Sequence, residues 1–232
     1  MKTKLVMLMG CQRSGTNALF DALAADGSVA SFNEHKSNDF YDDFYLKPLS
    51  AIQQLLDRSQ STVLLKPITE TIKRSILDVF EEFRDYNLLI PFIYRDPVNV
   101  FYSHFWMHLY LGFGVLDAPQ FIGLWNRRNA CVLEALDKYP ERVALVKYED
   151  LIDDPQVFFD LCRFLGIRGK YNFRNDSMEG RRLLPMVVQE QLIESTGSML
   201  AALNNRRSFR PHPNPAIRTV RKLRTRLLGS GC

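Results

Sequence analysis

Leu5-Val6-Met7-Leu8-Met9-Gly10-Cys11-Gln12-Arg13-Ser14-Gly15-Thr16-Asn17 is the stretch that decides the fold of this 232-residue chain. Its first five residues are all apolar, which predicts a buried strand. A glycine-bearing turn follows, and apolar residues then recur with helical spacing from Thr16 to Ala25. Such a loop at a helix N-terminus points several backbone N–H groups at one place, which suits a phosphate. We therefore expect an α/β fold that binds a phosphorylated ligand after its first strand.

Further apolar runs alternate with helical patterns along the chain. The other expected strands are Ser28–Asn33, Thr62–Lys66, Leu88–Tyr94 and Arg142–Lys147. The expected helices are Glu70–Arg84, a segment opened by Asp96-Pro97, Pro119–Lys138, and a segment from Asp154-Pro155 to Leu165. Strands that are apolar throughout and alternate with helices predict a parallel sheet covered on both faces. The fold class expected is thus three-layer, P-loop-like α/β, with a central parallel sheet of about five strands flanked by helices.

The carboxyl ends of the strands are where such a fold binds ligands. The residues just after the expected strands are 10–16, 33–36, 66–70, 95–96 and 147–150. The polar and aromatic stretch 34–48 is expected to be a loop with short helical pieces, and 168–215 gives few clear elements.

Charge is distributed unevenly along the chain. Eight of the 30 basic residues and none of the 26 acidic residues follow Glu194, so residues 1–194 carry a net charge of −4 and the tail carries +8. We expect a single α/β domain at 1–205 and a basic, partly helical C-terminal tail at 206–232. Apolar residues recur near one face of 217–228. A basic amphipathic helix of this kind is compatible with an anionic membrane or a polyanionic acceptor, and also with a solvated terminal helix.

Composition excludes several other classes of protein. A hydrophobic content of 46% and a charged content of 24% are ordinary for a globular chain with a core. The four cysteines are scattered, with no metal spacing and no disulfide framework, as in a reduced cytosol. The longest apolar runs are too short for a signal peptide or a membrane span. We therefore expect a cytoplasmic protein, in contact with a membrane at most peripherally, with no nucleic-acid partner.

The glycine loop only partly matches a Walker A motif. Gly10 and Gly15 have the correct spacing, but Thr16 and Asn17 stand where the motif requires Lys and then Ser or Thr. The cation lies inside the loop instead, as Arg13. Without the lysine and the Mg²⁺-binding hydroxyl in register, ATP–Mg²⁺ is disfavoured as the ligand. A tight strand–helix turn with no ligand is the alternative interpretation.

Three motifs resemble those of sulfotransferases, whose sulfuryl donor is 3′-phosphoadenosine 5′-phosphosulfate (PAPS). Gly10–Leu19 is similar to the 5′-phosphosulfate loop of the family, a basic residue followed by Ser/Thr-Gly-Thr. Arg95 and Ser103, eight residues apart, match the pair that binds the 3′-phosphate of the donor. Tyr148-Glu149-Asp150 matches a third motif that follows a strand. The resemblance covers roughly residues 4–166, and each motif directly follows an expected strand.

The resemblance implies a donor site built around two arginines. The residues implied to bind the donor are Cys11, Gln12, Arg13, Ser14, Gly15, Thr16, Asn17, Arg95, Ser103 and Tyr148. Within this set, Arg13 neutralises the 5′-phosphosulfate, Arg95 and Ser103 hold the 3′-phosphate, and Tyr148 lies near the adenosine. A further family segment at the 3′-phosphate has only a loose candidate here, Gly180-Arg181-Arg182.

The resemblance also implies catalytic groups at two strand ends. A strand-end lysine, here Lys66, stabilises the charge that grows on the bridging oxygen. The acceptor hydroxyl needs a base. Cytosolic small-molecule sulfotransferases use a histidine two residues after that lysine, where this chain has Ile68. Branches that act on glycans or protein tyrosines use a glutamate after the second strand, so Glu34 is the expected base and His35 the second candidate.

The function expected is metal-independent transfer of a sulfuryl group from PAPS to an acceptor hydroxyl. A Glu34-type base favours a small-molecule or glycan acceptor, in particular a carbohydrate or glycolipid, over a flat phenol. Two alternatives stay open at this point. One is a P-loop nucleotide kinase or ATPase, and the other is a non-catalytic protein that keeps the nucleotide-binding loops.

Overall fold

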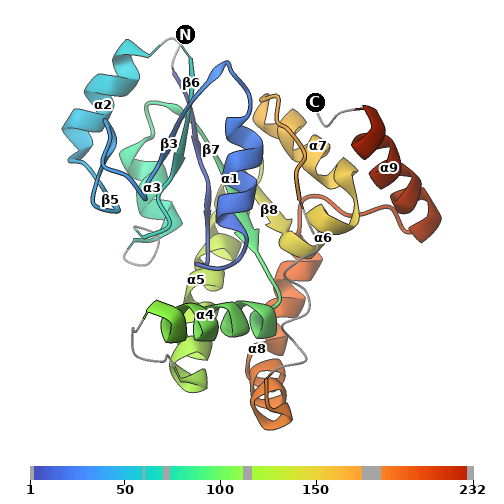
Figure 1. Cartoon of the computed structure of the whole chain (residues 1–232). Coiled ribbons are helices and arrows are strands. Elements are labelled where there is room, and N and C mark those ends of the chain that lie inside the picture. The colour runs from blue at the N-terminus through green and yellow to red at the C-terminus, as the bar shows by residue number, and fades with distance from the viewer. Residues whose placement is uncertain (1–2, 60, 70–73, 112–116, 174–183, 229–232) are drawn as a thin grey trace.

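The structure, a computed structural model, describes residues 3–59, 61–69, 74–111, 117–173 and 184–228. A parallel sheet forms its centre and helices cover both faces (Figure 1). The strands of the sheet are β1 (Lys4–Met7), β2 (Met9–Gly10), β3 (Val29–Asn33), β6 (Thr62–Lys66), β7 (Asn87–Tyr94) and β8 (Val143–Lys147). The expected three-layer α/β class and its five strands are confirmed, with the first strand divided at Leu8 into β1 and β2.

The first strand lies in the middle of the sheet, in the order β3-β6-β1-β7-β8. Leu5 pairs with Val63 of β6 on one side and with Leu88 of β7 on the other. Beyond β1, the short β2 continues along β7. A strand with covered neighbours on both sides and helices above and below must be apolar throughout, which is why these runs are continuous. The loop after β2 therefore opens at the centre of the sheet's carboxyl edge.

Successive residues of the central strand point to opposite faces and seed two hydrophobic clusters. Val6 and Leu8 belong to one cluster, and Leu5 and Met7 belong to the other. The first cluster is completed by α1 (Thr16–Ala24), α6 (Tyr148–Asp153) and α7 (Pro155–Leu165). The second is completed by α2 (Leu49–Arg58), α3 (Ile76–Glu82), α4 (Pro97–Leu111), α5 (Ala118–Lys138) and α8 (Met186–Arg206).

Three expectations for the local structure were wrong. The stretch 34–48 contains a two-stranded hairpin, β4 (Tyr41–Asp42) and β5 (Tyr45–Leu46), where short helical pieces were expected. The helix expected from Glu70 begins at Ile76, because the Ser75 side chain caps it in a reciprocal capping box; residues 70–73 lie outside the described part. The region 168–215 contains the 21-residue α8. Few α8 side chains are fully buried, so its apolar periodicity is weak.

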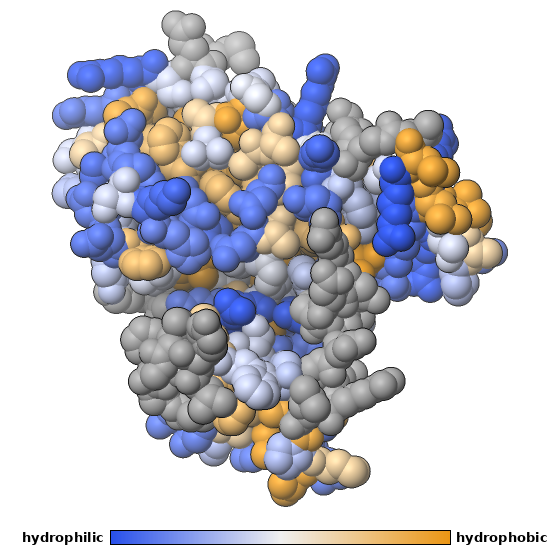
Figure 2. Space-filling model, in the orientation of Figure 1, coloured by the Kyte–Doolittle hydropathy of each residue, from blue (hydrophilic) through white to orange (hydrophobic). Residues whose placement is uncertain are grey.

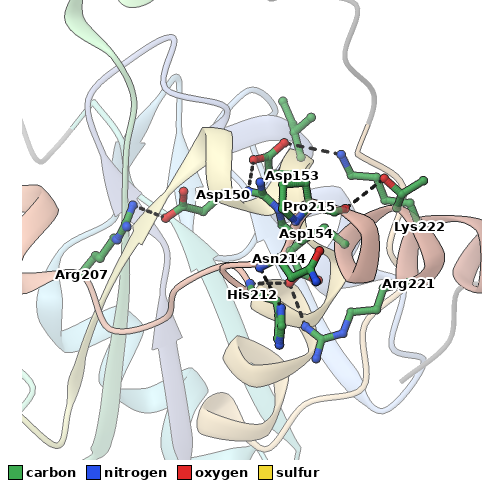
Figure 3. A network of polar contacts seen from close by, with 12 residues as sticks. Asp150, Asp153, Asp154, Arg207, His212, Asn214, Pro215, Arg221 and Lys222 are labelled. Carbon is green, nitrogen blue, oxygen red and sulfur yellow. Dashed lines mark hydrogen bonds and ion pairs between the residues drawn. The ribbon is translucent and has the colours of Figure 1, made fainter.

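The C-terminal segment returns to the body of the protein. The Ser208 N–H donates to the Leu145 carbonyl at 2.9 Å and the Ser208 hydroxyl accepts from the Leu145 N–H at 2.9 Å, which closes the outer edge of β8. The last helix, α9 (Pro215–Leu228), lies against α7. Figure 3 shows its polar contacts with Asp153 and Asp154. Among the described residues, no helix has both the length and the apolar character needed to cross a membrane.

Candidate active site

Glycine is required at two points of the loop between β2 and α1. A side chain on Gly10 would have its Cβ 2.3 Å from the Ile93 carbonyl oxygen of the neighbouring strand. A Cβ on Gly15 would lie 2.2 Å from the Tyr148 ring, and Gly15 has a φ of +91°, which favours glycine. The loop therefore fits closely against β7 and against Tyr148 before α1 begins at Thr16.

Arg95 follows β7 and is 4% exposed. Its guanidinium lies over the Tyr148 ring at 4.9 Å from the centroid, and its Nε is 3.9 Å from Glu149 Oε1. An Nη1–H of Arg95 donates to the Arg13 carbonyl at 3.3 Å. These contacts join the ends of β7 and β8 to the phosphate loop, so the three motifs of the sequence meet in one place.

Arg13 and Ser103, ninety residues apart, are in direct contact. The Arg13 Nε–H donates to the Ser103 Oγ at 2.9 Å. Partial burial, and then the nearby Arg95, lowers the pKa of the Arg13 guanidinium. The two guanidinium groups repel one another, and an anion bound between them would relieve this repulsion. Ser14 adds a hydroxyl that is buried and has no hydrogen-bond partner among the described residues. The arrangement fits a multiply charged anion.

Glu149 organises the start of α4. Its Oε1 accepts from the Asp96 N–H at 3.1 Å and from the Asn99 side-chain amide at 3.4 Å. Asp96 caps α4 by accepting from the Val98 N–H at 3.0 Å, as the sequence predicts. The role of Glu149 was not predicted, although its place in the Tyr-Glu-Asp motif was noted.

Lys66 lies 1% exposed at the end of β6. Its ammonium donates to Asn17 Oδ1 at 2.6 Å and lies 3.1 Å from His35 Nε2. Burial lowers the pKa of Lys66, while Glu34 and Asp21 act in the opposite direction. Burial and then Lys66 lower the pKa of His35. The candidate catalytic lysine is therefore held between a residue of the phosphate loop and a residue that follows β3.

Glu34 lies beside this lysine and is 3% exposed. Its Oε2 accepts from the Thr69 N–H at 2.8 Å, and its Oε1 is 3.8 Å from Lys66 Nζ. Burial raises the pKa of Glu34, and the Thr69 N–H and then Lys66 partly offset this effect. All three predicted catalytic residues are thus brought together, and Thr69, which lies within the expected ligand-binding segment 66–70, is a neighbour that was not predicted individually.

A cavity of about 170 Å³ opens over these groups. It is lined by Gln12, Arg13, Thr16, Asn17, Glu34, His35, Phe44, Lys66, Ile68, Thr69 and Met107. Phe44 and Met107 were not predicted as site residues, because only the tertiary fold brings the β4–β5 hairpin and α4 to this place. The cavity joins the phosphate loop to the candidate base and is large enough for part of an acceptor.

Phe44 has an unusual backbone for a bulky residue. Asp43 and Phe44 form the two-residue loop of the β4–β5 hairpin, with φ values of +40° and +72°. Positive φ angles at both central residues are characteristic of a type I′ turn, which favours Asn or Asp followed by Gly. The Phe44 ring is 45% exposed, and its centroid lies 5.5 Å from that of the His35 ring. An aromatic side chain is thus held at the cavity despite an unfavourable φ.

Cys11 was predicted to bind the donor, but its side chain points to the opposite side of the loop. The thiol is buried, accepts from the Asn129 side-chain amide at 3.4 Å and lies near Arg128 of α5. Burial raises its pKa to about 11. Cys11 can therefore contribute only backbone to a ligand of the loop. The loose candidate Gly180-Arg181-Arg182 lies outside the described residues.

Family membership agrees with this geometry. The sequence profile of the family described as "Sulfotransferase domain" matches residues 3–196. The chain therefore belongs to the sulfotransferase family, a class of PAPS-dependent enzymes, and the resemblance found in its three motifs is confirmed. No curated protein sequence matches the chain.

Solved sulfotransferase structures share the fold. A sulfotransferase from Alicyclobacillus acidocaldarius superposes with a TM-score of 0.64 at 17% identity, covering 90% of this chain and 98% of that one. The sulfotransferase domain of the Synechococcus PCC 7002 olefin synthase gives a TM-score of 0.51 at 20% identity, with 98% and 96% covered. At such identities the likeness concerns the fold alone.

Proposed function

We propose that the protein transfers the sulfuryl group of PAPS to an acceptor hydroxyl in the cavity beside Lys66. The observation that carries the proposal is the meeting of Arg13, Arg95 and Ser103 at the phosphate loop. A ligand with phosphate groups at both ends of its ribose would satisfy two adjacent guanidinium groups and a helix N-terminus. ATP has no phosphate group on its 3′ oxygen. The loop also has no lysine at the position that the binding of ATP–Mg²⁺ requires.

The donor site divides between the two arginines. Arg95 and Ser103 hold the 3′-phosphate, with Tyr148 beside the adenosine. Arg13 reaches Ser103 as well as the cavity, so it spans both ends of the donor. The backbone N–H groups of Ser14–Asn17, together with the Ser14 and Thr16 hydroxyls, hold the 5′-phosphosulfate. Charged and neutral donors in fixed positions suit an anion whose charge shifts during the reaction.

Lys66 and Glu34 supply the chemistry. PAPS, when bound, provides a sulfuryl group whose bond to the bridging oxygen breaks as the acceptor oxygen attacks in line. Lys66 donates a hydrogen bond to that bridging oxygen and so stabilises its growing charge. Ionised Glu34 takes the proton of the acceptor hydroxyl. His35, neutral because its pKa is lowered, is the second candidate for that proton. No residue in this scheme requires a metal.

The acceptor enters past Phe44, Ile68 and Met107. A lining that combines apolar side chains with polar and charged groups fits a molecule that combines a hydroxyl-bearing part with an apolar face. A glycolipid or another carbohydrate combines these features, since sugar rings stack through their C–H faces on aromatic side chains. We therefore keep a carbohydrate or glycolipid hydroxyl as the proposed acceptor.

Ligand-dependent melting tests the donor assignment. We expect 3′,5′-adenosine bisphosphate to raise the melting temperature by several degrees and ATP–Mg²⁺ to leave it unchanged, because a ligand stabilises only the state that binds it. Arg95→Met should abolish the shift, and Arg84→Met, a change at an exposed arginine far from the loop, should not. A larger shift with ATP–Mg²⁺ would favour a kinase or ATPase instead.

Transfer of labelled sulfate tests catalysis. We expect label from [³⁵S]PAPS to appear on at least one member of a panel of glycans, glycolipids and simple alcohols, and on none with the Arg95→Met variant. Binding of the bisphosphate without transfer to any acceptor, and without slow hydrolysis of PAPS, would indicate a non-catalytic nucleotide-binding protein.

A further inference from the structure

The C-terminal helix α9 turns its basic face inward and its apolar face outward. Most surface helices do the opposite, because an apolar stripe gains free energy when it is buried. In α9, Arg218, Arg221 and Lys222 are half-buried against the body of the protein, whereas Val220 and Leu223 are exposed. Two features of α9 bear on this orientation: the contacts of its inner, basic face and the surroundings of its outer, apolar face.

Ion pairs hold the basic face in place. Arg221 donates to Asp154 Oδ2 at 2.8 Å (Figure 3), and Arg218 donates to Asp153 Oδ2 at 2.7 Å. Lys222 lies 3.6 Å from the other oxygen of Asp153. Asp154 is fully buried and also accepts from the His212 N–H at 2.9 Å, so the loop before α9 is tied to the same carboxylate. These contacts fix which face of α9 looks outward.

The outward face carries a strip of four apolar side chains. They are Ile217, Val220, Leu223 and Leu227, with exposed fractions of 39%, 63%, 53% and 83%. Val220, Leu223 and Leu227 are spaced by three and four residues, which places them on one side of the helix. Figure 2 shows this strip as a hydrophobic area at the edge of the molecule. Its length from Ile217 to Leu227 is about 15 Å.

Positive charge borders the strip. Arg224 and Arg226 are exposed, and neither forms an ion pair with a carboxylate in the part of the chain that the structure describes. No acidic residue follows Glu194 in the sequence. The acidic neighbour Asp153 is already paired with Arg218 and Lys222. An occupant of this surface therefore meets apolar groups together with uncompensated positive charge.

The size of the strip argues against a second copy of the chain. Four partly exposed aliphatic side chains offer apolar surface on the order of 300 Å². A stable protein–protein interface buries about 800 Å² on each partner. Two such helices facing each other would also bring Arg224 and Arg226 close to their own copies. A lipid surface needs no matching protein area, and its binding increases with apolar burial and with attraction to anionic headgroups.

We propose that α9 is a peripheral membrane anchor for an anionic bilayer. The strip from Ile217 to Leu227 lies among the lipid chains just below the headgroups, and Arg224 and Arg226 lie at the lipid phosphates. Asp153 and Asp154 keep the helix docked with the strip outward, so no rearrangement of the domain is needed before contact. The anchor is independent of the sulfuryl-transfer proposal, since it lies on α7, away from the phosphate loop.

Vesicle co-sedimentation of the full chain tests the anchor. We expect binding to vesicles of phosphatidylcholine and phosphatidylserine at 7:3, and binding at least about tenfold weaker to pure phosphatidylcholine or in high salt. Leu223→Ser/Leu227→Ser should weaken binding to the anionic vesicles about tenfold or more. Because both side chains are exposed, the variant should keep its fold, which circular dichroism and its melting temperature would check.

Matched controls separate the strip from general surface properties. Met186→Ser/Val187→Ser removes two apolar side chains of similar exposure from α8 and should bind like the wild type. Arg224→Glu/Arg226→Glu should lose most of its binding to the anionic vesicles. Arg58→Glu/Arg84→Glu makes the same change of charge elsewhere on the surface and should retain more of that binding than Arg224→Glu/Arg226→Glu does. Equal binding of the Leu223→Ser/Leu227→Ser variant and the wild type would overturn the proposal. A second result would also overturn it. In that result the wild type has no affinity for vesicles and is a dimer by light scattering, and the Leu223→Ser/Leu227→Ser variant is a monomer.

Discussion

Glu34 and His35 are adjacent in sequence, yet their surroundings give them different properties. Glu34 is buried, one oxygen is fixed by the Thr69 N–H, and the other faces Lys66. His35 is exposed and contacts Lys66 through Nε2. A buried carboxylate that is fixed by a backbone N–H and faces Lys66 is better placed than an exposed ring, which favours Glu34 as the proposed base.

Glu34→Gln tests this assignment with little change of shape, since glutamine can still accept from the Thr69 N–H. We expect kcat to fall at least about 100-fold, with affinity for 3′,5′-adenosine bisphosphate unchanged by calorimetry. His35→Ala should keep activity within about tenfold of the wild type. The reverse pattern, an active Glu34→Gln and an inactive His35→Ala, would assign the proton to His35.

The pH dependence of kcat/KM follows from the charges of Glu34 and Lys66. The base must be ionised, and burial raises the pKa of Glu34, so kcat/KM should fall on the acid side at a pH above 4.5. Lys66 must be protonated, and burial lowers its pKa, so kcat/KM should fall on the alkaline side at a pH below 10.5. In Lys66→Arg, whose guanidinium stays charged, the residual activity should lack the alkaline fall. An unchanged alkaline fall in this variant would assign it to another group.

At the scale of elements, the β4–β5 hairpin combines local strain with a place at the cavity. Phe44→Gly would create Asp-Gly, the favoured type I′ pair, and would relieve a positive φ. We expect stability in urea to rise by about 0.5–1 kcal/mol, and the acceptor KM to rise several-fold as the ring is lost from the cavity wall. Asp43→Gly, the matched control, relieves the other positive φ but keeps the ring, so its KM should not change. If the acceptor KM of Phe44→Gly equalled that of the wild type, the Phe44 ring would have no part in acceptor binding.

Elements with a strong local signal were predictable, and those that depend on tertiary contacts were not. Four of the five strands follow from continuous apolar runs, and β3, an edge strand that contains Ser31 and Asn33, follows from a weaker pattern. The resemblance at Arg95 and Ser103 predicts where the candidate donor site lies. The hairpin was missed because its loop, Asp43-Phe44, lacks the glycine that marks such turns. α8 was missed because its buried residues are few and widely spaced. The partners of Glu34 and Arg95 come from distant strand ends, which no sequence spacing reveals.

At the scale of the molecule, the C-terminal segment acts as a strap that closes the sheet. Arg207 donates to Asp150 at 2.8 Å, and Ser208 pairs with Leu145 at the free edge of β8. Burial raises the pKa of Asp150 and Arg207 opposes this effect, so loss of Arg207 leaves a buried carboxylate without its partner. An uncovered strand edge is also a template for pairing with other chains. The strap thus protects the strand whose end carries Tyr148.

Two truncations separate the strap from the helix that follows it. Ending the chain after Asn214 removes α9 but keeps Arg207 and Ser208, so we expect a loss of about 1–2 kcal/mol in urea unfolding, mainly from the Arg221–Asp154 pair. Ending it after Arg206 should cost about 3 kcal/mol more, from the two Leu145 hydrogen bonds and the unpaired Asp150. Only the shorter chain should aggregate, as followed by light scattering, because only there is the outer edge of β8 bare. If both truncations lost the same stability and stayed equally soluble, the contacts of Arg207 and Ser208 would not be what secures β8, and the stabilising part of the tail would be α9 alone.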